Sequence, residues 1–130
     1  MTDLERANEF FKNDRFAMPT TGIRIDAVGE KYARCSLLLD ERHLNAEGRV
    51  MGGVYYTLAD FTFAVASNFD QPPTVTIVSQ ISYLGVPQDK KLISESRLIK
   101  DGRRTCVYEI TITDGQNNPV AVVSTTGIHV

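Results

Sequence analysis

One segment of this chain strongly limits the folds available to it: residues 53–68 are apolar on nearly every side of a helix. Asp60 carries the only formal charge between Gly52 and Asn68. A helix of this kind is normally buried on most of its faces, so the rest of the chain must cover it. A carboxylate kept among apolar residues is costly, and groups with perturbed ionisation are often functional. The pattern therefore predicts a buried helix and makes Asp60 the first candidate for chemistry.

The rest of the chain is patterned mainly as β-strand. Alternating apolar residues predict strands over residues 23–28, 32–40, 74–84, 92–100, 105–113 and 120–128. A short amphipathic helix over residues 3–14, which Asp3 can cap, and a linker over residues 18–22 precede them. A polar loop over residues 41–51 leads into the long helix, and Pro72-Pro73 forbids that helix to continue.

This order of elements predicts how the long helix is covered. Short turns such as Asp101-Gly102 make the last three strands an antiparallel meander. The economical solution is a single curved sheet wrapped around the helix, an α+β design known as the hot-dog arrangement. One side of the sheet or helix would then remain for another subunit to cover.

Composition limits the protein's size and partners. The chain has 130 residues, of which 42% are hydrophobic and 23% charged, which suits one soluble domain over residues 1–130, with residues 1–21 as N-terminal helix and linker. A net charge of −2 argues against nucleic acid as the partner. No apolar run is long enough to span a bilayer, so no membrane partner is expected, and the first residues lack an apolar signal core. We therefore expect a cytoplasmic protein.

The two cysteines, Cys35 and Cys106, each fall within a strand pattern. They are expected to be buried, reduced thiols, as is usual in that compartment. A catalytic cysteine would need one of the only two histidines, His43 or His129. A zinc site would need closely spaced ligands such as Cys-x-x-Cys, and none occurs. The sequence therefore predicts no metal site.

A motif spans the polar loop and the start of the long helix. Residues 43–53 read His-Leu-Asn-Ala-Glu-Gly-Arg-Val-Met-Gly-Gly, and residues 57–60 read Thr-Leu-Ala-Asp. This pattern resembles the hot-dog acyl-CoA thioesterases of the phenylacetate-pathway (PaaI-like) family, whose motif is Asn-x-x-Gly-x-x-[His]-Gly-Gly followed by Leu-x-Asp on a helix. Residues 81–87 also look like the family's strand and proline-ended turn. The resemblance extends from about residue 22 to the end of the chain.

The resemblance implies a set of catalytic roles. Asp60 matches the carboxylate that attacks the thioester or activates a water. Gly52 matches the glycine whose backbone N–H binds the thioester oxygen, a task that suits a helix N-terminus. Asn45 matches the residue that orients the nucleophile or the thioester. Thr76 is the nearest match to the strand hydroxyl that holds the water.

The resemblance also implies how the substrate is held. The substrate-binding candidates are Met51, Gly53, His43, Arg103 and Arg104. Some of the turn cations Lys90, Lys91, Arg103 and Arg104 would meet the phosphates of coenzyme A. Met51 stands where the family commonly has histidine, which removes a side chain that can hydrogen-bond near the thioester but leaves the backbone donor. No metal or redox cofactor is implied, since coenzyme A enters as part of the substrate.

The spacing of Gly52 and Asp60 bears on assembly. They lie eight positions apart, and a helix rises about 1.5 Å per residue, so roughly 12 Å separates them along its axis. One helix cannot present both groups to the same thioester, whereas two antiparallel helices can. The family resemblance implies the same pairing, a homodimer with shared sites, and often a dimer of dimers.

Other interpretations remain open from the residues alone. Asp60 can be a structural carboxylate, Asn45 a turn residue, His43 a loop residue and Thr76 strand filler. The glycine pair can be a tight helix entry, and Arg103-Arg104 solvated turn charges. The protein can bind acyl-CoA without cleaving it, as a sensor, or be a hot-dog dehydratase, although the long helix carries no histidine for that chemistry. The sequence does not name the acyl group.

Overall fold

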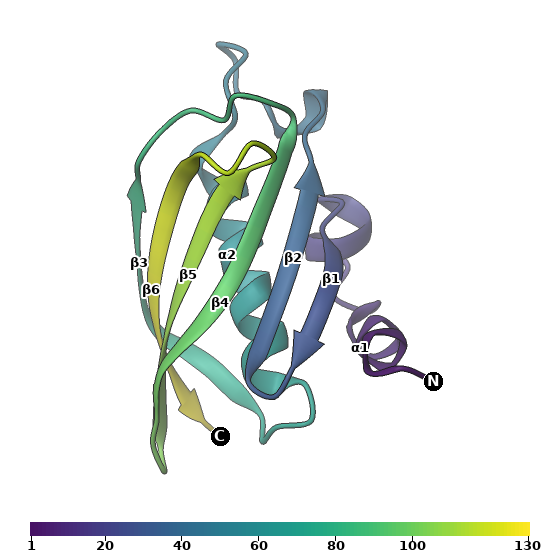
Figure 1. Cartoon of the computed structure of the whole chain (residues 1–130), viewed down its shortest axis with the longest axis vertical. Helices are drawn as coiled ribbons and strands as arrows, with labels where there is room; N and C mark the ends of the chain where they lie inside the picture. The colour runs from purple at the N-terminus through teal and green to yellow at the C-terminus, as the bar shows by residue number, and fades with distance from the viewer.

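A computed structural model describes residues 1–130 and shows one antiparallel sheet of six strands curved around a long helix (Figure 1). The elements are α1 (Asp3–Phe11), β1 (Arg24–Gly29), β2 (Tyr32–Leu38), α2 (Gly52–Asn68), β3 (Thr74–Tyr83), β4 (Lys91–Asp101), β5 (Thr105–Asp114) and β6 (Pro119–His129). The strand order is β1-β2-β4-β5-β6-β3. This is the predicted α+β hot-dog arrangement, and the predicted meander of the last three strands is confirmed.

The core lies between α2 and the concave face of the sheet. Strand β5 shows why, because its alternate residues Cys106, Tyr108, Ile110 and Ile112 are all buried on one face. On the helix, Phe63 packs its ring edge-on against Tyr108, with 5.5 Å between the ring centroids. The alternate apolar residues of the strands thus pack against the apolar surface of α2 in one core.

The N-terminal segment departs from its predictions in detail. Thr2, rather than Asp3, caps α1, through a capping box in which Glu5 bonds back to Thr2. Part of the expected linker forms a π-helical turn, η1 (Phe16–Thr20). Helix α1 packs mainly against β1 (Figure 1), and the ring of Phe11 at its end meets Phe61 of α2 edge-on at 5.9 Å between centroids.

Helix α2 is covered incompletely within one chain. Its inward residues are buried, but an open stripe runs along its outer side at Gly53, Thr57, Asp60 and Ala64. The expectation of a buried Asp60 is therefore wrong for the single chain, because the sheet covers one side of α2 and the N-terminal segment covers only part of the other.

Strand β3 forms an edge of the sheet and carries apolar side chains into solvent. It pairs with β6 on one side and with no strand on the other. Val75, Ile77 and Val78 are 49%, 53% and 60% exposed, around an irregularity in the pairing between Thr76 and Val78. An exposed apolar edge strand is a ready surface for another chain.

Neither helix combines the length and the hydropathy needed to cross a bilayer.

Candidate functional site

The loop over residues 41–51 sets the start of α2, and Asn45 shapes that loop. Its side-chain oxygen accepts the backbone N–H groups of Glu47 at 2.9 Å and Arg49 at 3.1 Å. Its own backbone N–H donates to the Arg49 carbonyl at 2.7 Å. Asn45 is therefore a turn-forming residue whose side-chain NH₂ group makes no bond in the protein and is free for a substrate.

His43 anchors the same loop from within. It is buried, in the 3₁₀ turn η2 (Glu41–His43). Its Nδ1 accepts the backbone N–H of Asp40 at 2.9 Å, and Nε2 lies 2.7 Å from the Thr21 carbonyl, which can only accept a hydrogen bond. The partners thus assign the proton to Nε2. Because both ring nitrogens hold backbone groups, His43 has no polar atom left for the substrate contact that the sequence suggested.

The first turn of α2 offers free backbone donors. No hydrogen bond within the protein engages the N–H groups of Gly52 or Gly53, and no side chain caps the helix at Met51. The Tyr83 hydroxyl donates to the Gly52 carbonyl at 3.1 Å, and a Cβ at residue 52 would lie 3.0 Å from that hydroxyl. Free N–H groups and the helix dipole together favour negative charge at this point.

Asp60 lies in a surface hollow of about 350 Å³ on the outer side of α2. Residues 13–17 form the opposite wall, next to Thr57, Phe61 and Ala64 of the helix. The Asp60 carboxylate takes part in no hydrogen bond and no ion pair of the protein, even though Arg15 lines the same hollow. Although the side chain is exposed, two effects raise the pKa of Asp60 above its usual range. The larger is partial desolvation, and the smaller is the negative charge of Asp14. A carboxylate without structural partners is available for chemistry.

One chain does not bring the predicted catalytic residues together. Gly52 lies at the start of α2 beside Tyr83, whereas Asp60 lies about two turns along the helix in a separate hollow. Thr76 is half-buried on β3 next to the irregularity in the pairing, and its hydroxyl makes no hydrogen bond in the protein. Met51 is 56% exposed beside Gly53. Gly52 and Asp60 both lie on α2, whose outer side the chain covers only in part.

The predicted arginines lie at the far end of the sheet. Arg104 follows the turn between β4 and β5, and its carbonyl accepts the backbone N–H of His129. His129 in turn pairs with Thr74, at the start of β3. Gly52 lies beside Tyr83, at the other end of this strand of 10 residues. The strand's length places Arg103 and Arg104 roughly 30 Å from Gly52 of the same chain.

A cavity of about 540 Å³ adjoins the first turn of α2. Its lining is Leu39, Asp40, Glu41, Leu44, Gly48, Arg49, Val50, Tyr55, Val86, Pro87, Asp89 and Lys90. Five of these residues are hydrophobic and five are charged, so the cavity combines apolar surface with polar groups that could orient a small molecule. Sequence reasoning missed this cavity and also the Asp14 charge beside Asp60, because the residues involved come from distant segments with no common motif.

The family follows from a direct match. The model of the thioesterase superfamily matches residues 47–121, which is more than half of the chain and includes Gly52, Asp60 and Thr76. The chain belongs to the thioesterase superfamily. The PaaI-like resemblance is also confirmed: the chain is 29% identical over 120 residues to the acyl-coenzyme A thioesterase PaaI of Escherichia coli, covering 91% of this chain and 84% of that protein.

Further relatives agree with the fold. A putative esterase of Archaeoglobus fulgidus is 29% identical over 125 residues, 95% of this chain and 80% of the relative. The structure of E. coli PaaI, from the phenylacetic acid degradation operon, superposes with a TM-score of 0.90 at 26% identity, covering 98% of this chain and 93% of that one. A hypothetical thioesterase of Streptococcus pneumoniae, solved with coenzyme A, gives 0.84 at 22% identity, covering 92% and 96%.

Proposed function

We propose that this protein hydrolyses an acyl-CoA thioester to a carboxylic acid and free coenzyme A. The observation that carries the proposal is the unpartnered carboxylate of Asp60 on the open stripe of α2, in a chain of the thioesterase superfamily. The similarity to a relative named as an acyl-coenzyme A thioesterase, and to a fold neighbour solved with coenzyme A, supports the substrate class.

The proposed chemistry divides the work between a base and an oxyanion site. Asp60 accepts a proton from water as the water oxygen attacks the thioester carbon, or Asp60 attacks that carbon itself. The N–H of Gly52 binds the oxygen on which negative charge develops. Thr76 holds the water and the free NH₂ of Asn45 orients the thioester. The C–S bond then breaks, and the sulfur leaves as the thiolate of coenzyme A. In the second route, water then hydrolyses the anhydride between the acyl group and Asp60, which releases the carboxylic acid and restores the carboxylate.

We further propose that each site is built from two copies of the chain. Because roughly 12 Å separates Gly52 from Asp60 along α2, one copy cannot present both to a single carbonyl group. Two antiparallel α2 helices related by a two-fold axis bring Gly52 of one copy to Asp60 of the other, twice per homodimer. The apolar edge of β3 and the open stripe of α2 support this pairing, and further association to a tetramer belongs to the same proposal.

The substrate would extend from the thioester into the cavity beside the first turn of α2. Its apolar residues suit an acyl or pantetheine chain. Arg49 and Lys90 are the cations that could meet phosphate, in a lining that also holds the carboxylates of Asp40, Glu41 and Asp89. These two cations replace Arg103 and Arg104 as the nearer candidates for coenzyme A within one chain. Arg103 and Arg104 can contact a substrate whose thioester lies at Gly52 only if they belong to another copy of the chain.

A binding protein without catalysis is the second candidate, because Met51 occupies the position where the family commonly has histidine. Replacing Met51→His separates the two. If the backbone of Gly52 is the oxyanion donor, kcat/KM for acyl-CoA changes by less than ~10-fold, since the donor survives any side-chain change. A wild type inactive on every acyl-CoA, with activity acquired by Met51→His, would favour the sensor.

The proposed function is tested by following free thiol release from short, long and aromatic acyl-CoAs. We expect wild type to hydrolyse at least one, and Asp60→Asn to lose at least ~100-fold in kcat, as removal of a general base or nucleophile does. Asp14→Asn, a carboxylate in the same hollow, is the matched control and should keep kcat within several-fold. Near wild-type hydrolysis by folded Asp60→Asn would contradict the assignment.

A further inference from the structure

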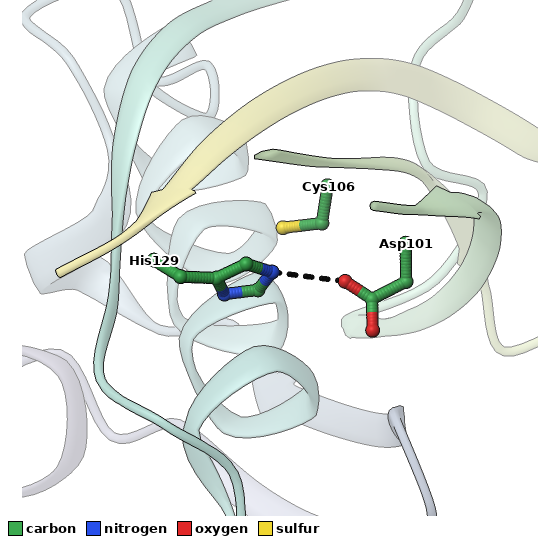
Figure 2. A group of neighbouring side chains, drawn as sticks. All are labelled: Asp101, Cys106 and His129. Atoms are coloured by element: carbon green, nitrogen blue, oxygen red, sulfur yellow. Dashed lines mark hydrogen bonds and ion pairs between the residues drawn. The ribbon is translucent and has the colours of Figure 1, made fainter. Parts of the chain in front are cut away.

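Three neighbouring strands bring Asp101, Cys106 and His129 together at the end of the sheet remote from Gly52 (Figure 2). One ligand atom from each, a carboxylate oxygen, Sγ and a ring nitrogen, lies within 4.8 Å of the others. Cys106 pairs with Asp101 on β4 and with Gly127 on β6, and His129 follows on the same face of β6. Nothing in the proposed thioester chemistry uses this cluster.

An irregularity in β4 puts the carboxylate in place. The pairing of β4 with β5 shifts by one residue between Leu98 and Lys100, so that Asp101 lies opposite Cys106. In regular pairing, Lys100 would take that position, because a shift of one residue exchanges the two faces of a strand. The extra residue thus replaces an ammonium group with a carboxylate next to the thiol.

Gly127 leaves room for the thiol on the other side. A Cβ at residue 127 would lie 3.1 Å from Cys106 Sγ and 2.7 Å from Phe63 Cζ. No side chain therefore separates Sγ from the His129 ring along β6. Cys106 is a free, buried cysteine, as the sequence predicted.

The hydrogen bonds of His129 leave one nitrogen for a cation. The Thr74 hydroxyl donates to the Pro72 carbonyl at 3.0 Å, so it accepts from His129 Nδ1 at 2.8 Å. The other nitrogen, Nε2, lies 2.9 Å from Asp101 Oδ1, an acceptor. Two lone pairs cannot face each other at this distance, so either a proton or a metal ion must lie between them.

We propose that Cys106 Sγ, His129 Nε2 and Asp101 Oδ1 bind one divalent transition-metal ion of the Zn²⁺ type, with water in the fourth position. Thiolate, imidazole and carboxylate are the ligands that Zn²⁺ takes in proteins, at about 2.3, 2.0 and 2.0 Å. Tetrahedral angles at these lengths require Nε2 and Oδ1 to separate by ~0.4 Å from their present distance. They also require Sγ to lie about 3.5 Å from both atoms, so the Cys106 side chain must approach from a separation of up to 4.8 Å. Thr74 on Nδ1 is the outer partner that commonly orients a ligating histidine.

The charges around the cluster are compatible with a cation. Lys31 pairs with the second oxygen of Asp101 at 2.7 Å, which leaves Oδ1 free for the metal. A bound metal removes the Cys106 proton outright. Two anionic ligands then outweigh the one ammonium group, that of Lys31, which pairs with them.

The absence of a Cys-x-x-Cys spacing in the sequence does not exclude this site. Asp101 and Cys106 are five positions apart in the sequence, and Cys106 and His129 are 23 positions apart. Strand pairing, rather than sequence proximity, makes them neighbours. A bound ion would tie the ends of β4, β5 and β6 together and stabilise the folded state.

The test is metal binding by the full chain after removal of metal with a chelator. Co²⁺ should bind one per chain and give a thiolate-to-cobalt charge-transfer band with the intense visible bands of a tetrahedral site. In competition with a chromophoric chelator, Cys106→Ser should weaken Zn²⁺ binding by more than ~100-fold, since loss of even an outer partner costs about 10–100-fold. Cys35→Ser, which alters the other buried thiol, is the matched control and should bind as wild type does.

Asp101→Asn provides a second variant at a less buried ligand, should Cys106→Ser fold poorly. Zn²⁺ should raise the Tm of wild type and of Asp60→Asn, but not that of Asp101→Asn, which keeps the metal site distinct from the proposed activity. Wild-type protein without the charge-transfer band, or a band that survives Cys106→Ser, would overturn the proposal. The cluster would then be only a hydrogen-bonded network of Lys31, Asp101 and His129.

Discussion

Asp60 has no polar partner in the protein, yet its surroundings make its ionisation harder. Partial desolvation and the charge of Asp14 both raise its pKa. A base or nucleophile must be ionised, so activity should be present above this pKa and be lost as the pH falls through it. The acid limb of the pH profile should therefore lie above the range of an ordinary aspartate.

Asp14→Asn tests this cause directly. Removing the neighbouring negative charge should lower the pKa of Asp60 and move the acid limb of the kcat/KM profile to lower pH. The measurement is kcat/KM against pH for wild type and the variant, with Asp26→Asn as a control at a carboxylate outside the hollow. An acid limb that stays in place or moves upward in Asp14→Asn would contradict the account.

For single residues, the sequence identifies candidates for the site better than it predicts how those residues are buried or bonded. The lone charge in an apolar helix singles out Asp60 from the pattern alone. Its exposure could not be predicted, because how much of α2 is covered depends on the tertiary packing of α1 and the sheet. The anchoring role of His43 depends on the Thr21 carbonyl, which comes from a segment that no local pattern connects to the loop.

The strands and α2 follow closely from periodicity, because alternate burial in a strand and an apolar helix are strong local signals. The pairing of the strands can be predicted from the sequence only in part. The sequence indicates the meander of β4, β5 and β6 through its short turns, but not that β3 pairs with β6 or that β4 slips by one residue before Asp101. These features depend on the closure of the whole sheet and on register, which periodicity does not determine.

Gly127 on β6 provides a test of packing at the scale of an element. In Gly127→Ala, the new Cβ would lie 2.7 Å from Phe63 Cζ and 2.9 Å from Thr74 Cγ2. We expect a loss of about 1–3 kcal/mol in the free energy of unfolding, the usual cost of overpacking. Urea denaturation gives the value. Gly29→Ala, whose Cβ would make only ordinary contacts at 3.6 and 3.7 Å with Tyr32, is the control, and equal losses in both variants would argue against the packing explanation.

For the whole molecule, we propose that residues 1–130 form one hot-dog domain that is incomplete as a single copy. The open stripe of α2 and the apolar edge of β3 lie outside the core that the chain builds for itself. The sequence anticipates this through an apolar helix that one sheet cannot cover. It does not say which edge of the sheet associates, since that depends on the strand order.

A charged substitution on strand β3 tests whether its apolar edge takes part in association. Val78→Lys places an ammonium group in the exposed apolar edge, and we expect it to shift the protein toward monomers and to reduce thiol release in proportion. Sedimentation velocity measures the association state. Leu38→Lys, at an apolar residue on β2 that is even more exposed than Val78, should change neither property. A fully active monomeric Val78→Lys protein would exclude the shared site.

The complementation of two inactive variants tests the shared site most directly. Asp60→Asn removes the base. Gly52→Pro removes the N–H donor at the first helical position, where proline is tolerated, and it is made together with Tyr83→Phe to clear the hydroxyl near the new ring. Tyr83→Phe alone is the control and should remain active.

Each inactive variant should release almost no thiol by itself. Mixed at equal amounts and reassembled, they should regain up to roughly a quarter of wild-type activity, because random pairing makes half of the dimers mixed and each mixed dimer has one intact site. Mixed dimers that are verified to form, yet release no thiol above the separate variants, would contradict a site formed by Gly52 of one copy and Asp60 of the other.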